Sequence, residues 1–216
     1  MSCSSALDCF IKNYLKSYQD TLSEFPRYYP VGEDSICIQG TFNADTDDTV
    51  FWQPIKRDNA ADFSNVEHAL NIQLHQDIHA FYGQYFSAPL QFTSSFGDGE
   101  LLQAWNQDDF EHLQQNVIGH LIMKKKLKQP ATWFIGVLGE GEQMLTVNND
   151  DGSVWIEIPG QKQSSQVAPS LTQFLQQLSP MIKPPVKPSE DTSTLVDHPG
   201  IWQRIKIMWH TLLGKK

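Results

Sequence analysis

Five carboxylates and two imidazoles crowd into the stretch from Phe96 to Leu121, FGDGELLQAWNQDDFEHLQQNVIGHL. The carboxylates are those of Asp98, Glu100, Asp108, Asp109 and Glu111, and the imidazoles are those of His112 and His120. Side chains of these types supply metal ligands, the acid and base of a hydrolase, or an anionic surface that binds cationic partners. Their spacing bears on which of the three chemistries applies.

A metal site is the least supported of the three. His112 and His120 are eight residues apart, which on a helix separates them by roughly 12 Å along the axis, too far to share one ion. His75 and His79 in HQDIH have the spacing of helical zinc ligands, but Gln76 replaces the catalytic Glu of the zincin motif. No third ligand is evident. We therefore expect neither a metal nor a cofactor.

Nucleophilic and phosphate chemistry find no motif in the chain. There is no G-x-S-x-G elbow and no Gly-rich phosphate loop of standard spacing, and the turns GDGE and GEGE lie between strand patterns. Asp108 and Asp109 are adjacent carboxylates that could form the acid/base pair of an unrecognised hydrolase. The remaining possibility is an anionic docking surface.

Helix electrostatics explains part of the acidic cluster. The acids of QDDFE fall in the first turn of a predicted helix, where the macrodipole favours anions, and a lysine run lies at the helix end, where it favours cations. Asp98 and Glu100 are not explained in this way, because they lie on the preceding turn and strand. If that hairpin folds onto the start of the helix, one hollow carries all five carboxylates with Trp105 beside them. A docking surface and an ordinary solvated face both remain open.

The net charge of the 216-residue chain is −9, and it is unevenly divided. Residues 1–182 hold 10 basic and 22 acidic residues, which gives −12, whereas residues 183–216 hold 6 and 3, which gives +3. An acidic body repels phosphate, so we expect no nucleic-acid partner, and it attracts a basic peptide or loop. Solubility alone would favour the same charge.

The sequence has no recognisable signal for export or membrane crossing. Its N-terminus, MSCSSALDCFIKNYLKSYQ, has no basic run followed by an unbroken apolar stretch, and no window has about 18 consecutive apolar residues. The three cysteines show neither the number nor the spacing of a disulfide framework or a zinc site. We expect a cytosolic protein with free thiols.

Apolar periodicity places the predicted elements that position these residues. Helices are predicted over 5–22, with Ser4 or Ser5 as cap, over 66–70, with Asn65 as cap, and over 76–86, 106–126 and 170–178. Strands are predicted over 35–40, 49–55, 90–95, 100–105, 132–138, 143–149 and 154–159, with the last three as an antiparallel meander. The order predicts an α+β fold with a mostly antiparallel sheet flanked by helices.

Six runs of the sequence resemble Syd, the SecY-interacting protein family of gammaproteobacteria, over nearly all of residues 6–182. They are VFWQP (50–54), NVEHAL (65–70), IHAFYGQYF (78–86), LLQAWNQDDF (101–110), QQNVIGHL (114–121) and KLKQPATWFI (126–135). The resemblance implies a SUKH-superfamily fold, no enzymatic activity, and an acidic concave groove that binds cytosolic loops of SecY, the channel subunit of the Sec translocase. Such a protein would regulate the translocase or serve its quality control.

The resemblance brings no short catalytic motif, so the partner-binding candidates come from the residues alone. They are Asp98, Glu100, Trp105, Asp108, Asp109 and Glu111. An immunity-type protein of the same superfamily, which neutralises a basic nuclease toxin, is the alternative function.

Beyond the predicted domain of residues 1–182, the chain continues as a Pro-rich linker, 183–194, and a basic tail, 195–216. The predicted membrane-contact residues of the tail are Ile201, Trp202, Arg204, Ile205, Lys206, Met208, Trp209, Leu212 and Leu213. The apolar members form one helical stripe, and a basic amphipathic helix with two tryptophans suits an anionic membrane surface. We therefore expect a peripheral protein at the cytoplasmic side of the inner membrane, with a soluble cytoplasmic pool. Docking of the tail on the body, or on another partner, remains open.

Overall fold

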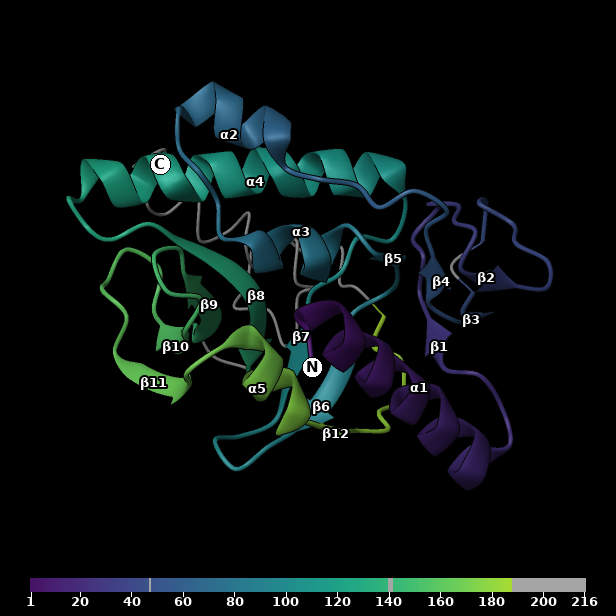
Figure 1. Cartoon of the computed structure of the whole chain (residues 1–216). Coiled ribbons are helices and arrows are strands. Elements are labelled where there is room, and N and C mark those ends of the chain that lie inside the picture. The colour runs from purple at the N-terminus through teal and green to yellow at the C-terminus, as the bar shows by residue number, and fades with distance from the viewer. Residues whose placement is uncertain (47, 140–141, 188–216) are drawn as a thin grey trace.

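Seven antiparallel strands form the central sheet, in the order β11-β10-β9-β8-β7-β6-β12 (Figure 1). The computed structural model describes residues 1–46, 48–139 and 142–187. The strands of this sheet are β6 (Leu90–Thr93), β7 (Gly99–Leu101), β8 (Thr132–Leu138), β9 (Met144–Asn148), β10 (Val154–Glu157), β11 (Ser165–Ala168) and β12 (Ser179–Pro180). With the helices that flank it, this sheet confirms the predicted α+β class.

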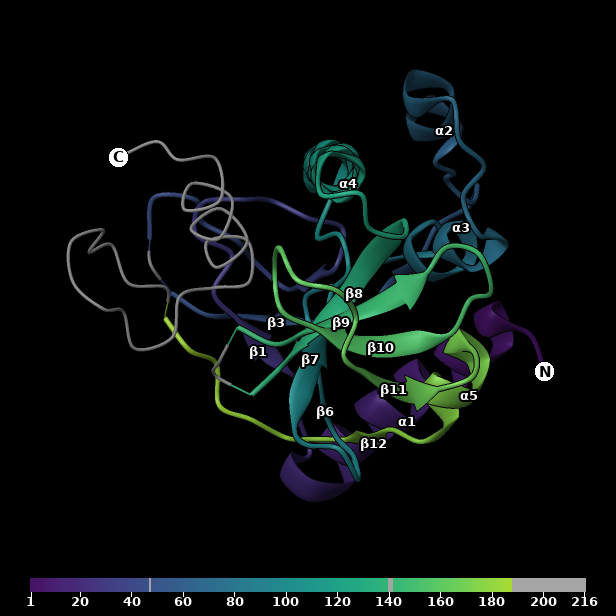
Figure 2. The same cartoon turned by 90° about the vertical axis from the view of Figure 1, so that its left-hand side faces the viewer.

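Helices pack on both faces of the sheet. They are α1 (Cys3–Leu22), α2 (Ser64–Leu70), α3 (Gln76–Tyr82), α4 (Gln107–Lys126) and α5 (Leu171–Gln176). α1 contacts both α3 and α5, and these three lie together on one side of the sheet, whereas α4 lies against β8 (Figure 2). β8 is covered on both of its faces and is therefore buried along its whole length.

Apolar spacing explains how α1 covers its face of the sheet. Ser2 caps the helix by accepting the N–H of Ser5, and Ser23 ends it in the left-handed conformation. The buried side chains recur three and four residues apart, at Cys3, Ala6, Leu7, Phe10, Ile11, Tyr14 and Tyr18. This stripe anchors the N-terminal helix to the core.

Alternation along β6 and β7 separates an apolar face from a polar one. Phe92 faces α5, where its ring centroid lies 6.2 Å from that of Phe174. The neighbouring Gln91 turns to the opposite face and donates to the carboxylate of Glu100 at 2.6 Å. The acid nominated on β7 therefore lies on the face of the sheet away from α1 and α5.

One row of paired residues links that acid to the centre of the sheet. Glu100 of β7 pairs with Val137 of β8, Val137 pairs with Met144 of β9, and Met144 pairs with Glu157 of β10. Directly paired residues share a face of a sheet. Glu100 and Glu157 thus lie on the same face, three strand spacings or roughly 14 Å apart.

Two small sheets complete the fold beside α1 and the start of α4. β1 (Arg27–Tyr28), β3 (Val50–Trp52) and β2 (Ile38–Gln39) form one in the order β1-β3-β2, and β4 (Ile55–Lys56) pairs with β5 (Tyr85–Phe86). Trp52 points inward, with its ring 6.3 Å from Tyr14, whereas Phe51 points outward beneath the guanidinium of Arg27 at 4.6 Å. The β1-β3-β2 sheet therefore has one buried and one solvent-facing side.

The predicted hairpin of β6 and β7, the meander of β8, β9 and β10, and the helices over 106–126 and 170–178 are confirmed. The predicted caps of α1 and α2 are wrong. Ser2 caps α1, and Asn65 lies inside α2, where its side-chain amide donates to Gln114 of α4 at 2.9 Å. The carboxylate of Asp62 accepts the N–H of Ser64 instead.

Several predicted element boundaries are also wrong. α3 ends at Tyr82 rather than near residue 86, because Tyr85 and Phe86 pair with β4. A Cβ on Gly83 would lie 1.9 Å from the carbonyl oxygen of Ala61, so this turn needs glycine. β7 ends at Leu101, and the polar strands β11 and β12 were not predicted.

Loss of the α4 cap gives a first test of the fold. Asn106 accepts the N–H of Asp109 and donates to the carbonyl of Asp34, so Asn106→Ala removes both bonds. We expect the free energy of unfolding in urea to fall by about 1 kcal/mol. Gln115→Ala, at an exposed position in the middle of α4, is the control. Equal stability of the two variants would contradict the capping role.

Candidate functional site

The acids at the start of α4 divide into exposed and buried side chains. Asp108 and Glu111 are exposed, and Gln107 donates to the carboxylate of Glu111 at 3.2 Å. No Lys or Arg in the described residues forms an ion pair with either of them. Both charges therefore face solvent without a cationic partner.

Asp109 is buried and serves the backbone. Its carboxylate accepts the N–H of Trp105 at 2.8 Å, which fixes the chain just before the helix. Burial raises the pKa of Asp109 to about 6, with a further rise from Glu33, against lowering by the Trp105 hydrogen bond and by His112. This carboxylate is thus held where its charged form is disfavoured.

Trp105 lies in the core and connects the start of α4 to the small sheet. Its ring is 3% exposed, and its centroid lies 5.0 Å from that of Tyr28 and 6.2 Å from that of Trp52. Its Nε1 donates to the carbonyl of Glu33 at 3.1 Å. Trp105 therefore supports the surface from beneath and brings the segment of Glu33 to it.

The charges of three carboxylates act on Tyr28. Burial raises the pKa of Tyr28, and the charges of Asp109, Glu33 and Glu100 raise it further. Glu100 is half-buried beside Gln91, on the same sheet face as α4. The charges of Glu100 and Asp109, both nominated from the sequence, thus act on the same side chain, as does that of Glu33. Their part in partner binding stays a prediction.

Asp98 lies in the turn that joins β6 and β7. This turn is the end of the hairpin that is farther along the chain from the start of α4. It is exposed, and its carbonyl accepts the N–H of Gly139 at 2.8 Å. The charge of Asp98 is not among those that raise the pKa of Tyr28. Its part in partner binding stays a prediction.

We call the set at the start of α4 the acidic surface. Its residues are Glu33, Asp34, Glu100, Asp108, Asp109 and Glu111. Sequence reasoning missed Glu33 and Asp34, because 72 residues separate each of them from its contact on Trp105 or Asn106. Only the tertiary packing of Trp105 and Asn106 reveals them.

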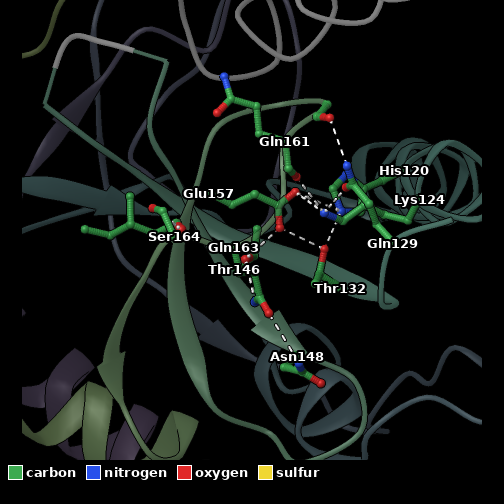
Figure 3. Close-up of polar contacts among 12 residues, drawn as sticks. His120, Lys124, Gln129, Thr132, Thr146, Asn148, Glu157, Gln161, Gln163 and Ser164 are labelled. Atoms are coloured by element: carbon green, nitrogen blue, oxygen red, sulfur yellow. Dashed lines mark hydrogen bonds and ion pairs between the residues drawn. The ribbon is translucent and has the colours of Figure 1, made fainter. Parts of the chain in front are cut away.

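A second cluster of polar residues is buried between α4 and the sheet (Figure 3). Lys124 of α4 forms an ion pair with Glu157 of β10 at 2.8 Å, and these side chains are 1% and 0% exposed. The ammonium also donates to the side chain of Gln129 at 2.9 Å and to the carbonyl of Gln161 at 3.1 Å. Three acceptors thus surround the buried cation.

The other oxygen of Glu157 accepts two hydrogen bonds (Figure 3). Its Oε2 accepts the hydroxyls of Thr132 at 3.0 Å and Thr146 at 3.1 Å. Because the Thr132 proton points to Glu157, the Nε2 of His120 donates to Thr132 at 2.9 Å. Burial, followed by the charge of Lys124, lowers the pKa of His120 to about 3, so this imidazole is neutral.

The buried cluster also escaped the sequence prediction. Lys124 belongs to a lysine run that the helix macrodipole explains, and His120 was considered only as a metal ligand. The available signal was Glu157, an acid on a strand, VWIEI, that is otherwise apolar. An acid in such a strand requires a buried cationic partner.

The two histidines at zinc-like spacing have local roles. The Nδ1 of His75 accepts the N–H of Asp77 and caps α3, and the Nδ1 of His79 accepts the N–H of Phe63 at 3.0 Å. Within residues 1–46, 48–139 and 142–187, no three His, Cys, Asp or Glu residues are grouped as metal ligands.

The predicted membrane-contact residues, 201–213, lie outside the described residues. In the part of the chain that the structure covers, no helix has the length and apolar character to cross a bilayer. The predicted linker, 183–194, is described only to residue 187.

Comparison with known proteins gives a consistent family. The model of a family described as Syd protein (SUKH-2) matches residues 4–180. A protein named Protein Syd from Shewanella frigidimarina is 87% identical over 216 residues, which covers 100% of both chains, and one from Shewanella putrefaciens is 64% identical over 215 residues with the same coverage. One from Shewanella denitrificans is 60% identical over 98% of this chain and 97% of its own. The similarity to the first two relatives includes residues 181–216, beyond the family match.

Removal of the buried cation tests the network in Figure 3. Lys124→Met leaves the carboxylate of Glu157 without its counter-ion, so we expect a loss of about 3–5 kcal/mol in the free energy of urea unfolding. Lys125→Met, at the neighbouring exposed position, should change it by less than about 0.5 kcal/mol. Lys124→Met/Glu157→Met should recover much of the loss, because no charge then remains buried. A neutral Lys124→Met variant would contradict the coupling.

The raised pKa of Asp109 predicts a pH-dependent stability. A folded pKa of about 6 exceeds the ordinary 3.8, so the contribution of Asp109 is complete below about pH 4 and is lost as the pH rises through 6. Asp109→Asn should therefore gain stability relative to the parent between pH 4 and 7, on the order of 1–3 kcal/mol in urea unfolding. Asp108→Asn, at an exposed position, should show a flat difference; a flat difference for both would refute the assignment.

Proposed function

The chain belongs to the Syd family, and on that premise we propose that it is a non-enzymatic binding protein of the Sec translocase. The acidic surface captures basic cytosolic loops of SecY, and the protein acts as a regulator or quality-control factor of the translocase. The observation that carries this proposal is the lack of ion pairs to Glu33, Asp108 and Glu111 in the described residues.

Charge complementarity supports the choice of partner. Cytoplasmic loops of membrane proteins carry an excess of Lys and Arg. An anionic surface speeds the encounter with such loops and orients them, more than it deepens affinity. The contacts of Trp105 and Asn106 fix the backbone of the surface, so a partner meets carboxylates that are already in place.

The arrangement of the adjacent aspartates supports a binding role rather than catalysis. Asp108 is exposed, whereas Asp109 is buried and accepts the N–H of Trp105. An acid/base pair would need both carboxylates to reach one substrate. The side chains of Asp108 and Asp109 instead lie in different surroundings, one in solvent and the other buried.

The tail adds a proposed second contact. Its basic residues and apolar stripe, over 201–213, suit the interface of an anionic membrane, where each basic residue near the surface adds about 1 kcal/mol. A loop of SecY and the lipid surface around it would then be bound by one chain. This gives a peripheral location at the cytoplasmic side of the inner membrane beside a soluble pool.

Charge reversal tests the acidic surface. Asp108→Lys/Glu111→Lys should weaken binding of SecY loop peptides at least about tenfold in a titration at low salt, or about 1.4 kcal/mol. Raising the ionic strength to about 1 M should weaken binding to the parent protein, since screening shortens to about 3 Å. The urea-unfolding curve should stay close to that of the parent.

The control for this experiment has the same change in charge. Glu142→Lys/Asp150→Lys alters two exposed acids outside the acidic surface and should leave binding within about twofold. Equal losses of binding affinity in the two double variants would mean that only the net charge of the protein matters. Preference for a basic nuclease toxin over SecY loops would favour the immunity-type alternative.

Flotation with vesicles tests the tail. The full chain should float with vesicles that contain anionic lipid, and the chain without residues 195–216 should remain in the soluble fraction, because the stripe and its basic residues are gone. Ile205→Asp in the full chain is the matched variant and should reduce flotation without a change in length. Equal flotation of all three proteins would reject membrane contact by the tail.

A further inference from the structure

Exposed apolar side chains gather in one part of the described chain. The described residues include nine exposed large hydrophobic residues, and five of these lie within the segment from Leu22 to Phe51. They are Leu22, Phe25, Val31, Ile36 and Phe51. The segment that carries them forms the end of α1 and the outer β1-β3-β2 sheet, at the right of Figure 1. Exposed apolar residues gathered in this way are typical of a contact surface.

The chain leaves the body beside this surface. Met181 donates to the carbonyl of Gln91, and Lys183 and Tyr18 of α1 share two hydrogen bonds, the hydroxyl donating to the Lys183 carbonyl at 3.2 Å and accepting its N–H at 3.3 Å. Leu22 is four residues beyond Tyr18, so the two lie on the same side of α1, one turn apart. The last described residue, 187, is therefore only four residues beyond Lys183, whose contact with Tyr18 lies at the edge of the exposed surface.

The charges of the two segments are complementary. Residues 20–51 contain seven carboxylates and one basic residue, Arg27, which is itself bonded to Glu24 at 3.0 Å. The tail, 195–216, contains four basic residues and one acidic residue. The surface and the tail of the same chain therefore carry charges of opposite sign.

We propose that residues 195–216 dock in cis on the surface around Leu22 and Phe51, with the apolar stripe of Ile201 to Leu213 against the exposed hydrophobic residues. The tether is short, so the local concentration of the tail near its exit is roughly millimolar and a weak contact suffices. Docking covers a stripe that includes two tryptophans and that water solvates poorly. Membrane contact then requires release of the tail, a consequence that rests on the proposed function.

Cysteine cross-linking in the full chain tests this contact. In a Cys9→Ser background, which removes the exposed thiol, Phe51→Cys is combined with Trp209→Cys, and disulfide formation is followed on non-reducing gels during mild oxidation. We expect an intramolecular disulfide to form at least about tenfold faster than with Gln166→Cys, an exposed position on the edge strand β11. Both positions are within reach, because 22 residues span up to about 75 Å, and the Ile205→Asp variant separates docking from proximity to the point of exit.

Further variants make the outcome decisive. Ile205→Asp in the tail should abolish the preference, and Leu22→Cys gives the same test where Phe51→Cys fails to fold. Equal rates at Phe51 and Gln166 would overturn the proposal, and a disulfide-linked dimer would place the tail on a second copy and also overturn docking in cis. The measurement needs neither SecY nor lipid, so a failure of the proposed function leaves its result intact.

Discussion

The ion pair between Lys124 and Glu157 fixes α4 to the sheet and thereby sets the position of everything that α4 carries. Taking two charges out of water is costly, and hydrogen bonds offset part of the cost here, from the ammonium to Gln129 and Gln161 and from two threonine hydroxyls to Oε2 of Glu157. A displaced helix would lose all of these bonds at once. The pair therefore specifies one arrangement of α4 more than it adds stability.

A rigid helix transmits that constraint to the acidic surface. Asp108 lies 16 residues from Lys124, which is roughly 24 Å along the axis. Near the lysine, the sheet face contributes Glu157, whose carboxylate pairs with the ammonium of the helix. At the other end, the face contributes Glu100, whose charge acts on Tyr28 together with those of Asp109 and Glu33. The same face thus carries a compensated acid under the helix and an acidic group at its edge. Burial, and to a lesser extent the charge of Glu33, raises the pKa of Asp109, so its charged form costs stability, and binding of a cationic partner would relieve part of the cost.

Local patterns predicted what local physics determines. The period of α1 and α4, the turn between β6 and β7, and the meander from β8 to β10 followed from apolar spacing and turn residues. The helix break at Gly83 did not, because the pairing of β5 with β4 competes with helix propensity there. β11 and β12 are polar edge strands whose neighbours in the sheet define them. In the site, Asp108 and Glu111 were found as exposed acids, whereas Glu33 and the partner of Glu157 depend on contacts between distant segments.

Charge alone does not distinguish a basic loop of SecY from the basic tail of this chain, because both are attracted by the same negative field. Discrimination must come from what lies beside the charge. The acidic surface is backed by buried aromatic rings and exposes polar groups, which suits a flexible loop rich in Lys and Arg. The surface around Leu22 and Phe51 exposes apolar side chains, which suits an amphipathic segment. The two proposed binding surfaces share one sign of charge and differ in hydrophobicity, so the hydrophobic component would direct each cationic segment to its own surface.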